Sequence, residues 1–269
     1  MSKLLAELQR LYFLPEQTGE CRIDGAATLG TLSPALAEQT LAAGGSLLLD
    51  AQSLAGEQRL LCLAFSRPSD WPHIASLLDA LIKELDLPAP AVSIDGQGHR
   101  LWFSLAQPVA AAQAQSFLDG LCQRYLSELP AARVHPGDET LLPLPPSPLA
   151  EGERWTAFID PDMGSMFLDE AWLDMPPGLD RQADLLAACK SIAIADFQRA
   201  LNLLFAPKTE STVKMPTFTV DTPETAKISQ PYNDPKSFLL AVMNDPNISL
   251  SQRIEAAKAL LPYYEGAPS

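Results

Sequence analysis

The residues whose types and spacing could do chemistry lie in the stretch 93–105, SIDGQGHRLWFSL. Glycines in a tight turn permit positive φ angles and let a ligand come close to the backbone. A histidine directly after such a turn could donate a hydrogen bond to a phosphate. The pattern predicts either a nucleotide-binding turn between two strands or a plain hairpin with a surface histidine. The candidate nucleotide-binding residues are Ser93, Gly96, Gly98, His99 and Arg100.

The elements around this turn are predicted from apolar periodicity. Residues 59–65 form a short apolar run typical of a buried strand, and Asp70-Trp-Pro opens a helix that prolines 88 and 90 end. Pro108 is expected to open the next helix. Residues 132–135, 140–144 and 155–159 are predicted as short strands. Strands alternating with helices, followed by a strand-rich section, predict an α+β domain with a mixed sheet and flanking helices.

The second half of the chain differs in kind. Residues 176–205 are predicted as a helical extension, broken near Ser191, and residues 206–233 as a flexible linker rich in Thr, Pro, Ser and Lys. Residues 234–265 are predicted to form a helical pair, with Asp234 as the cap of its first helix. Two short helices bury little apolar surface alone, so this unit is predicted to dock on a partner. Its candidate partner-binding residues are Phe238, Leu239, Val242, Met243, Ile254 and Leu261.

Composition limits the classes of function. The chain has 269 residues and a formal net charge of −14, which opposes binding along a nucleic-acid backbone and leaves nucleic acid as an open partner. The four cysteines are far apart and lack the spacing of a zinc site, which suits a reducing, cytoplasmic location. No apolar run approaches the length of a membrane span, so no membrane partner is expected.

Three segments in order resemble the archaeo-eukaryotic primase superfamily, most closely its primase-like domains in mobile-element conflict systems. They are the strand 61–66 with the helix opening at Asp70, the turn 93–103, and the closing section 133–160 with its Leu-Pro-Leu segment. The resemblance implies a primase-like domain over residues 1–175. It also implies that His99 contacts phosphate and that Asp160 is a third metal-binding carboxylate.

The same resemblance implies two carboxylates one residue apart on the first strand, where alternate side chains point the same way and can share a divalent metal. Ala64 and Ser66 stand at those positions. The domain is therefore interpreted as a degenerate primase that has lost its polymerase chemistry, with no cofactor expected. In an alternative register Asp50 survives as a ligand beside Asp160, and Mg²⁺ or Mn²⁺ would then be required. Asp160, which precedes a proline, could equally cap a turn.

The C-terminal helical pair resembles segments of small phage packaging proteins, which implies a mobile-element origin. Three functions follow as hypotheses. The favoured one is a catalytically inactive, primase-like binding or assembly factor in the DNA metabolism of a phage or plasmid. The alternatives are an active primase or polymerase with a non-standard metal site, and an acidic interaction or inhibitor protein.

Overall fold

The structure is a computed structural model that describes residues 1–52, 56–136, 141–149, 153–206 and 239–240. The chain divides into two units, Met1–Thr209 and Glu210–Ser269. The first unit combines two β-sheets with helices, which confirms the α+β class. All paired strands in the described part are antiparallel, so the mixed sheet expected from the sequence is corrected. No helix in that part is long and apolar enough to cross a membrane.

The smaller sheet has four strands in the order β2-β1-β3-β8. They are β1 (Thr18–Ile23), β2 (Ala26–Thr31), β3 (Ser46–Asp50) and β8 (Leu141–Leu144). A tight turn at Asp24 and Gly25 joins β1 to β2, and both of its residues have positive φ angles, which suits Asp-Gly. This hairpin was not predicted from the sequence.

The larger sheet has five strands in the order β7-β4-β6-β5-β9. They are β4 (Glu57–Phe65), β5 (Ala91–Ile94), β6 (His99–Ala110), β7 (Val134–Pro136) and β9 (Ala157–Ile159). The β5–β6 hairpin contains the glycine turn, as predicted. The expected helix start at Pro108 is wrong, because Pro108 continues β6 and the helix begins three residues later.

Three of the longer helices begin at a capping serine or at a proline. Ser2 and Ser33 accept backbone hydrogen bonds from the first turns of α1 and α2. The longer helices are α1 (Lys3–Tyr12), α2 (Pro34–Ala42), α3 (Trp71–Lys83), α4 (Ala111–Tyr125), α5 (Leu179–Ala187) and α6 (Ile194–Phe205). Two 3-10 segments, η1 (Pro68–Asp70) and η2 (Pro161–Phe167), complete the set.

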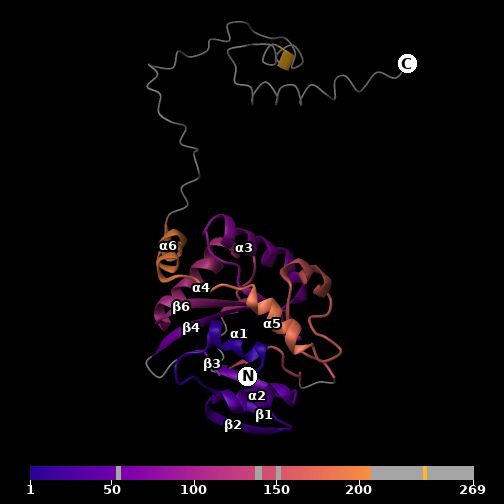
Figure 1. Cartoon of the computed structure of the whole chain (residues 1–269). Helices are drawn as coiled ribbons and strands as arrows, with labels where there is room; N and C mark the ends of the chain where they lie inside the picture. Colours follow the sequence, from indigo (N-terminus) through magenta and orange to yellow (C-terminus); the bar gives the residue numbers. More distant parts are fainter. Residues whose placement is uncertain (53–55, 137–140, 150–152, 207–238, 241–269) are drawn as a thin grey trace, which may run out of the picture. The chain divides into compact units, whose positions relative to one another are not determined.

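The larger sheet separates two apolar cores, because successive side chains of a strand point to opposite faces. On β6, Leu101 and Phe103 pack toward α3, α4 and α6, whereas Trp102 packs toward α1, α5 and the smaller sheet. Figure 1 shows α3 and α4 on one side of β4 and β6, and α1 and α5 on the other.

Helices α5 and α6 complete these cores. Leu186 of α5 is fully buried in one core, and Phe197 and Leu204 of α6 are buried in the other. The break between them falls at residues 188–193, as the sequence predicted near Ser191. Residues 176–205 are therefore packed within the first unit. The predicted linker 206–233 and helical pair 234–265 lie outside the described residues, apart from residues 206, 239 and 240.

Candidate functional site

The glycine turn is held by its own polar groups. Asp95 accepts hydrogen bonds on Oδ1 from the backbone N–H groups of Gln97 (3.0 Å) and Gly98 (2.8 Å). Its Oδ2 accepts from Nε of Arg100 at 2.7 Å. Both side chains of this ion pair are mostly buried. An anion arriving at the turn would therefore meet an arginine already paired with a carboxylate.

His99 is buried rather than presented to solvent. Its exposed fraction is 0 %, and its ring lies 5.0 Å from the ring of Trp71. Neither ring nitrogen makes a hydrogen bond of standard geometry. Burial lowers the pKa of His99 to about 4, although the Asp95 charge and the nearby Gly164 backbone raise it in part. A phosphate contact from this ring requires the covering residues to move.

The segment that covers this ring is η2. Gly164 is buried, and a Cβ at that position would overlap the six-membered ring of Trp71. The backbone of η2 can lie against the indole because residue 164 has no side chain. Trp71 lies in turn against His99, so the histidine, the tryptophan and η2 form one packed stack.

Three other residues of the turn also have structural partners. Ser93 is fully buried, and its hydroxyl accepts a hydrogen bond from the Trp102 indole at 2.7 Å. Gly96 has a φ of 91°, which favours glycine, and its N–H donates to the Ala171 carbonyl at 2.8 Å. A Cβ on Gly98 would overlap the Phe65 carbonyl oxygen. In this conformation the predicted nucleotide-binding residues support the hairpin.

The predicted metal-binding positions do not meet. Ala64 is buried on β4, opposite Arg100, and the Ser66 hydroxyl lies 3.5 Å from the Ala132 carbonyl. Asp160 follows β9, and both β6 and β5 lie between β4 and β9. Three strand spacings correspond to roughly 14 Å. Asp50 belongs to the other sheet, where Thr18 and the N–H of Gln52 donate to its carboxylate.

These residues do not fit a pair of divalent cations. Mg²⁺ and Ca²⁺ take oxygen ligands at about 2.0–2.6 Å, so their carboxylates must converge. Ala64 offers no donor, and Asp160 uses Oδ1 to accept from the N–H of Asp162 as the N-cap of η2. The capping role considered for Asp160 is thus the observed one. Within the described residues no group of three His, Cys, Asp or Glu side chains could hold a metal ion.

An open groove lies at the outer end of β9, beside Asp160. Its volume is about 610 Å³, within the size range of small-molecule sites. Its apolar lining includes Pro88, Pro90 and Ile159. Its charged lining consists of two cations, Arg181 and Lys190, and two carboxylates, Asp160 and Asp184. Sequence reasoning missed both cations, because two charged residues in a helical stretch are typical of any solvated face.

Gln182 closes the outer edge of β9. Its side-chain amide accepts from the Phe158 N–H at 2.7 Å and donates to the Phe158 carbonyl at 3.0 Å. The side chain is 3 % exposed. It therefore fixes α5 against the strand that forms the floor of the groove.

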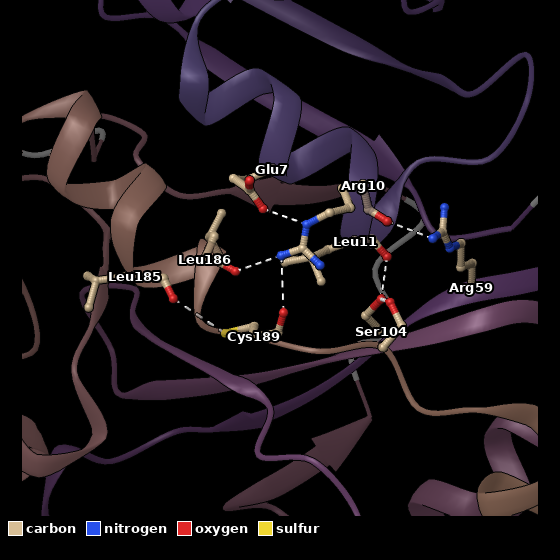
Figure 2. A network of polar contacts seen from close by, with 9 residues as sticks. Glu7, Arg10, Leu11, Arg59, Ser104, Leu185, Leu186 and Cys189 are labelled. Atoms are coloured by element: carbon tan, nitrogen blue, oxygen red, sulfur yellow. Dashed lines mark hydrogen bonds and ion pairs between the residues drawn. The ribbon is translucent and has the colours of Figure 1, made fainter.

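Helix α5, which forms one wall of the groove, is held in place by Arg10 of α1. Figure 2 shows the Arg10 guanidinium between Glu7 and the end of α5. Its Nη2 donates to the carbonyls of Leu186 (2.9 Å) and Cys189 (3.1 Å), and its Nε donates to Glu7 at 2.6 Å. A cation at the C-terminal end of a helix satisfies carbonyls that have no intrahelical partner. Leu186 and Cys189 both line the groove.

Arg59 repeats this arrangement at the end of α1. It donates to the carbonyls of Arg10 (2.6 Å), Phe13 (2.9 Å) and Leu105 (2.9 Å). Burial lowers the pKa of Arg59, and the charge of Arg10 lowers it further. Figure 2 also shows the Ser104 hydroxyl donating to the carbonyl of Leu11, next to this contact. Two arginines thus connect β4, α1 and α5 in series.

A buried ion pair joins the start of α3 to the residue before β7. Asp70, with a fully buried side chain, accepts hydrogen bonds from Nε and Nη2 of Arg133, with 3.2 Å between Nε and Oδ2. The Arg133 carbonyl accepts from the Ser66 N–H at 2.9 Å. The sequence showed Asp70 only as the residue at a helix start, and no local signal identifies its distant partner.

The predicted partner-binding residues are largely untested by the structure. Leu239 is helical and half-buried. The other five lie outside the described residues. They are Phe238, Val242, Met243, Ile254 and Leu261.

The chain has a structural likeness among solved proteins but no match by sequence. The sequence matches no protein-family profile and no curated protein. Among solved structures the chain is similar to the AEP domain of the primase-polymerase (PrimPol) of cyanophage S-2L. That likeness has 15 % sequence identity and a TM-score of 0.37, and it covers 62 % of this chain and 96 % of the other.

Proposed function

We propose that this chain is a non-catalytic, primase-like protein that serves as a binding or assembly factor in the DNA metabolism of a mobile element. The primase-like and mobile-element parts of the proposal rest on the ordered sequence segments described first. The non-catalytic part rests on the positions of the candidate ligands.

One observation carries the non-catalytic part. The two positions on β4 that would supply adjacent carboxylates are Ala64, which is buried and apolar, and Ser66, which lies by a backbone carbonyl. The remaining candidates are Asp50 on the smaller sheet and Asp160 just after β9 of the larger sheet, and both accept hydrogen bonds from backbone N–H groups. Two-metal nucleotidyl transfer needs its ligands around one site, so this arrangement favours binding over catalysis.

A nucleotidyl-transfer assay tests the proposal. Purified protein is incubated with a primed template, labelled nucleotides and either Mg²⁺ or Mn²⁺, beside a polymerase that serves as positive control. We expect no incorporation. Incorporation by the wild type that is lost in Asp160→Ala would contradict the proposal, because it would show that the carboxylate still acts in a metal site.

Nucleotide binding without catalysis is measured separately by thermal shift. Nucleoside triphosphates are titrated with and without Mn²⁺ against the wild type, His99→Ala and His135→Ala. A ligand that binds the folded state raises the melting temperature with its concentration. His135 is the matched control, because it is an exposed histidine on β7. A shift lost only in His99→Ala assigns binding to the turn, whereas the absence of a shift in all three proteins makes the fold a scaffold.

A further inference from the structure

Exposed apolar side chains concentrate in the segment that follows β9. The described residues include nine large apolar side chains that are exposed, and four of them lie between residues 163 and 175. They are Met163 (43 % exposed), Met166 (71 %), Leu168 (37 %) and Met175 (70 %). Exposed apolar side chains gathered in one segment mark interaction sites more often than scattered ones do.

The 3-10 geometry of η2 separates an inner from an outer face. With about three residues per turn, side chains three apart point the same way. Gly164 and Phe167 face inward, where Gly164 meets Trp71 and Phe167 packs on the main core. Met163 and Met166 share another face and are exposed. The packing of Gly164 and Phe167 therefore orients η2 so that Met163 and Met166 point to solvent.

The backbone after η2 is also anchored. Ala171 is fully buried, and its carbonyl accepts from the Gly96 N–H at 2.8 Å. Leu173 exchanges two backbone hydrogen bonds with Trp155, at 2.8 and 3.0 Å. The backbone that carries the exposed side chains is therefore held by hydrogen bonds. Binding of a partner then costs less conformational entropy of this segment.

The charge of this segment is mainly negative, although the Arg154 guanidinium lies 4.1 Å from the centre of the Trp172 ring. Residues 156–180 contain six carboxylates and no Lys or Arg. Asp162, Asp169 and Glu170 are exposed, and none of the ion pairs found among the described residues includes them. An apolar centre with unpaired acids beside it is complementary to a helix with one apolar and one basic side.

We propose that Met163, Met166, Leu168 and Met175, together with Asp162, Asp169 and Glu170, form a docking surface for a cationic amphipathic helix of a partner protein. We call this set the methionine surface. Methionine side chains adapt to differently shaped apolar partners. The proposal gives the binding role a partner chemistry and therefore rests on the proposed function. The transfer assay and the binding experiment below give independent results, so either can fail alone.

The probe is a fluorescent helical peptide of Leu and Lys with one apolar face, titrated with the full chain. Two control peptides keep its length: one of Ser and Lys has the charge without the apolar face, and one of Leu and Gln has the apolar face without the charge. We expect only the Leu and Lys peptide to bind tightly, and added salt to weaken its binding.

Variants assign the binding to the methionine surface. Met163→Ser with Met166→Ser is expected to weaken binding at least about tenfold, since two buried thioether side chains are lost from the contact. Asp169→Asn with Glu170→Gln is expected to weaken it several-fold and to reduce its salt dependence. Leu29→Ser is the apolar control, because Leu29 is 73 % exposed on β2. Asp79→Asn with Glu128→Gln is the charge control. All of the substituted residues are exposed in the wild type. Thermal unfolding of each variant verifies that it folds.

Three results would overturn the proposal. One is equal affinity of the wild type and the methionine variant, which would assign binding to the overall charge of −14. Another is the absence of wild-type binding at low salt. The third is a wild-type dimer that the methionine variant loses in sedimentation, which would make a second copy the occupant.

Discussion

The two ends of β5 differ in their surroundings: one is closed by packed side chains and the other borders an open groove. At the Ile94 end the glycine turn is closed: His99 lies under Trp71, η2 covers both, and Asp95 holds the turn together. At the Ala91 end an open groove of about 610 Å³ lies beside Asp160, with Arg181 and Lys190 on its wall.

The comparison shows that the sequence motif typical of ligand binding and the open surface lie at different ends of the strand. The turn has the pattern typical of ligand binding, yet its polar groups are committed to packing and internal hydrogen bonds. The groove has no recognisable motif and remains open. We therefore expect substitutions at the closed end to change stability and those at the open end to leave it unchanged.

The largest effect is expected at the ion pair of Asp70 with Arg133, since Asp70 directly precedes Trp71 at the closed end of β5. Asp70→Asn leaves Arg133 without its charge partner, and the free energy of unfolding should fall by about 3 kcal/mol, near the lower limit for a broken buried pair because Arg133 is partly exposed. Asp79→Asn on the same helix is the control, since its pair with Lys83 is exposed and should contribute below about 0.5 kcal/mol. Equal losses in urea unfolding would contradict the buried role of Asp70.

His99 should give the closed end a distinct pH dependence. Its pKa is about 4 in the folded chain and near 6.5 when unfolded, so between these values the unfolded state binds more protons. The wild type should lose on the order of 3 kcal/mol as the pH falls from 6.5 to 4, and His99→Leu should lack this loss.

Urea unfolding of both proteins at half-unit pH intervals measures the His99 effect. The wild-type and variant curves should diverge below pH 6.5. Parallel curves would mean that the ring is solvated in the folded state, and the contrast between the two ends of β5 would then disappear.

Gly164→Ala tests the contact between η2 and Trp71. The added methyl group would overlap the indole, so either η2 or the ring must shift, at about 1–3 kcal/mol. Gly178→Ala is the matched control, because nothing lies within 4 Å of a Cβ there and its φ of −64° suits any residue. Tryptophan fluorescence should change only in the first variant. Unchanged stability and fluorescence in Gly164→Ala would show that η2 is not packed on the ring.

The smallest effect is expected at the open end. Arg181→Ala with Lys190→Ala should alter the free energy of unfolding by less than about 0.5 kcal/mol, because both side chains are exposed and neither has a hydrogen bond or ion pair among the described residues. A loss above 1 kcal/mol in urea unfolding would make this end structural as well.

The sequence predicted most of the elements that are determined by apolar periodicity or by turn and helix-start residues within the same short segment. The strand at β4, the start of α3 after Asp70 and the β5–β6 hairpin follow from residues adjacent in the chain. The start of α4 was misplaced because proline is favoured at the first position of a helix, whereas Pro108 lies near the end of a long strand. The β1–β2 hairpin was missed, because β2 is exposed throughout and has no alternating pattern.

The candidate site was harder to predict, because burial and long-range pairing decide it. Nothing near His99 in the sequence shows that η2, more than sixty residues later, covers it. The pairing of Asp70 with Arg133 is equally distant in the chain. The separation of Asp50 from Asp160 depends on the strand order of two sheets, which no local pattern encodes.

The Gln182 amide has a consequence for self-assembly. An unpaired edge strand is a template on which a strand of another chain can add, and repeated addition produces fibrils. At β9 a side chain takes the place of the next strand and occupies both outward groups of Phe158. The sheet therefore ends at this position, and association along β9 by strand addition is blocked without a charged or proline residue in the strand itself.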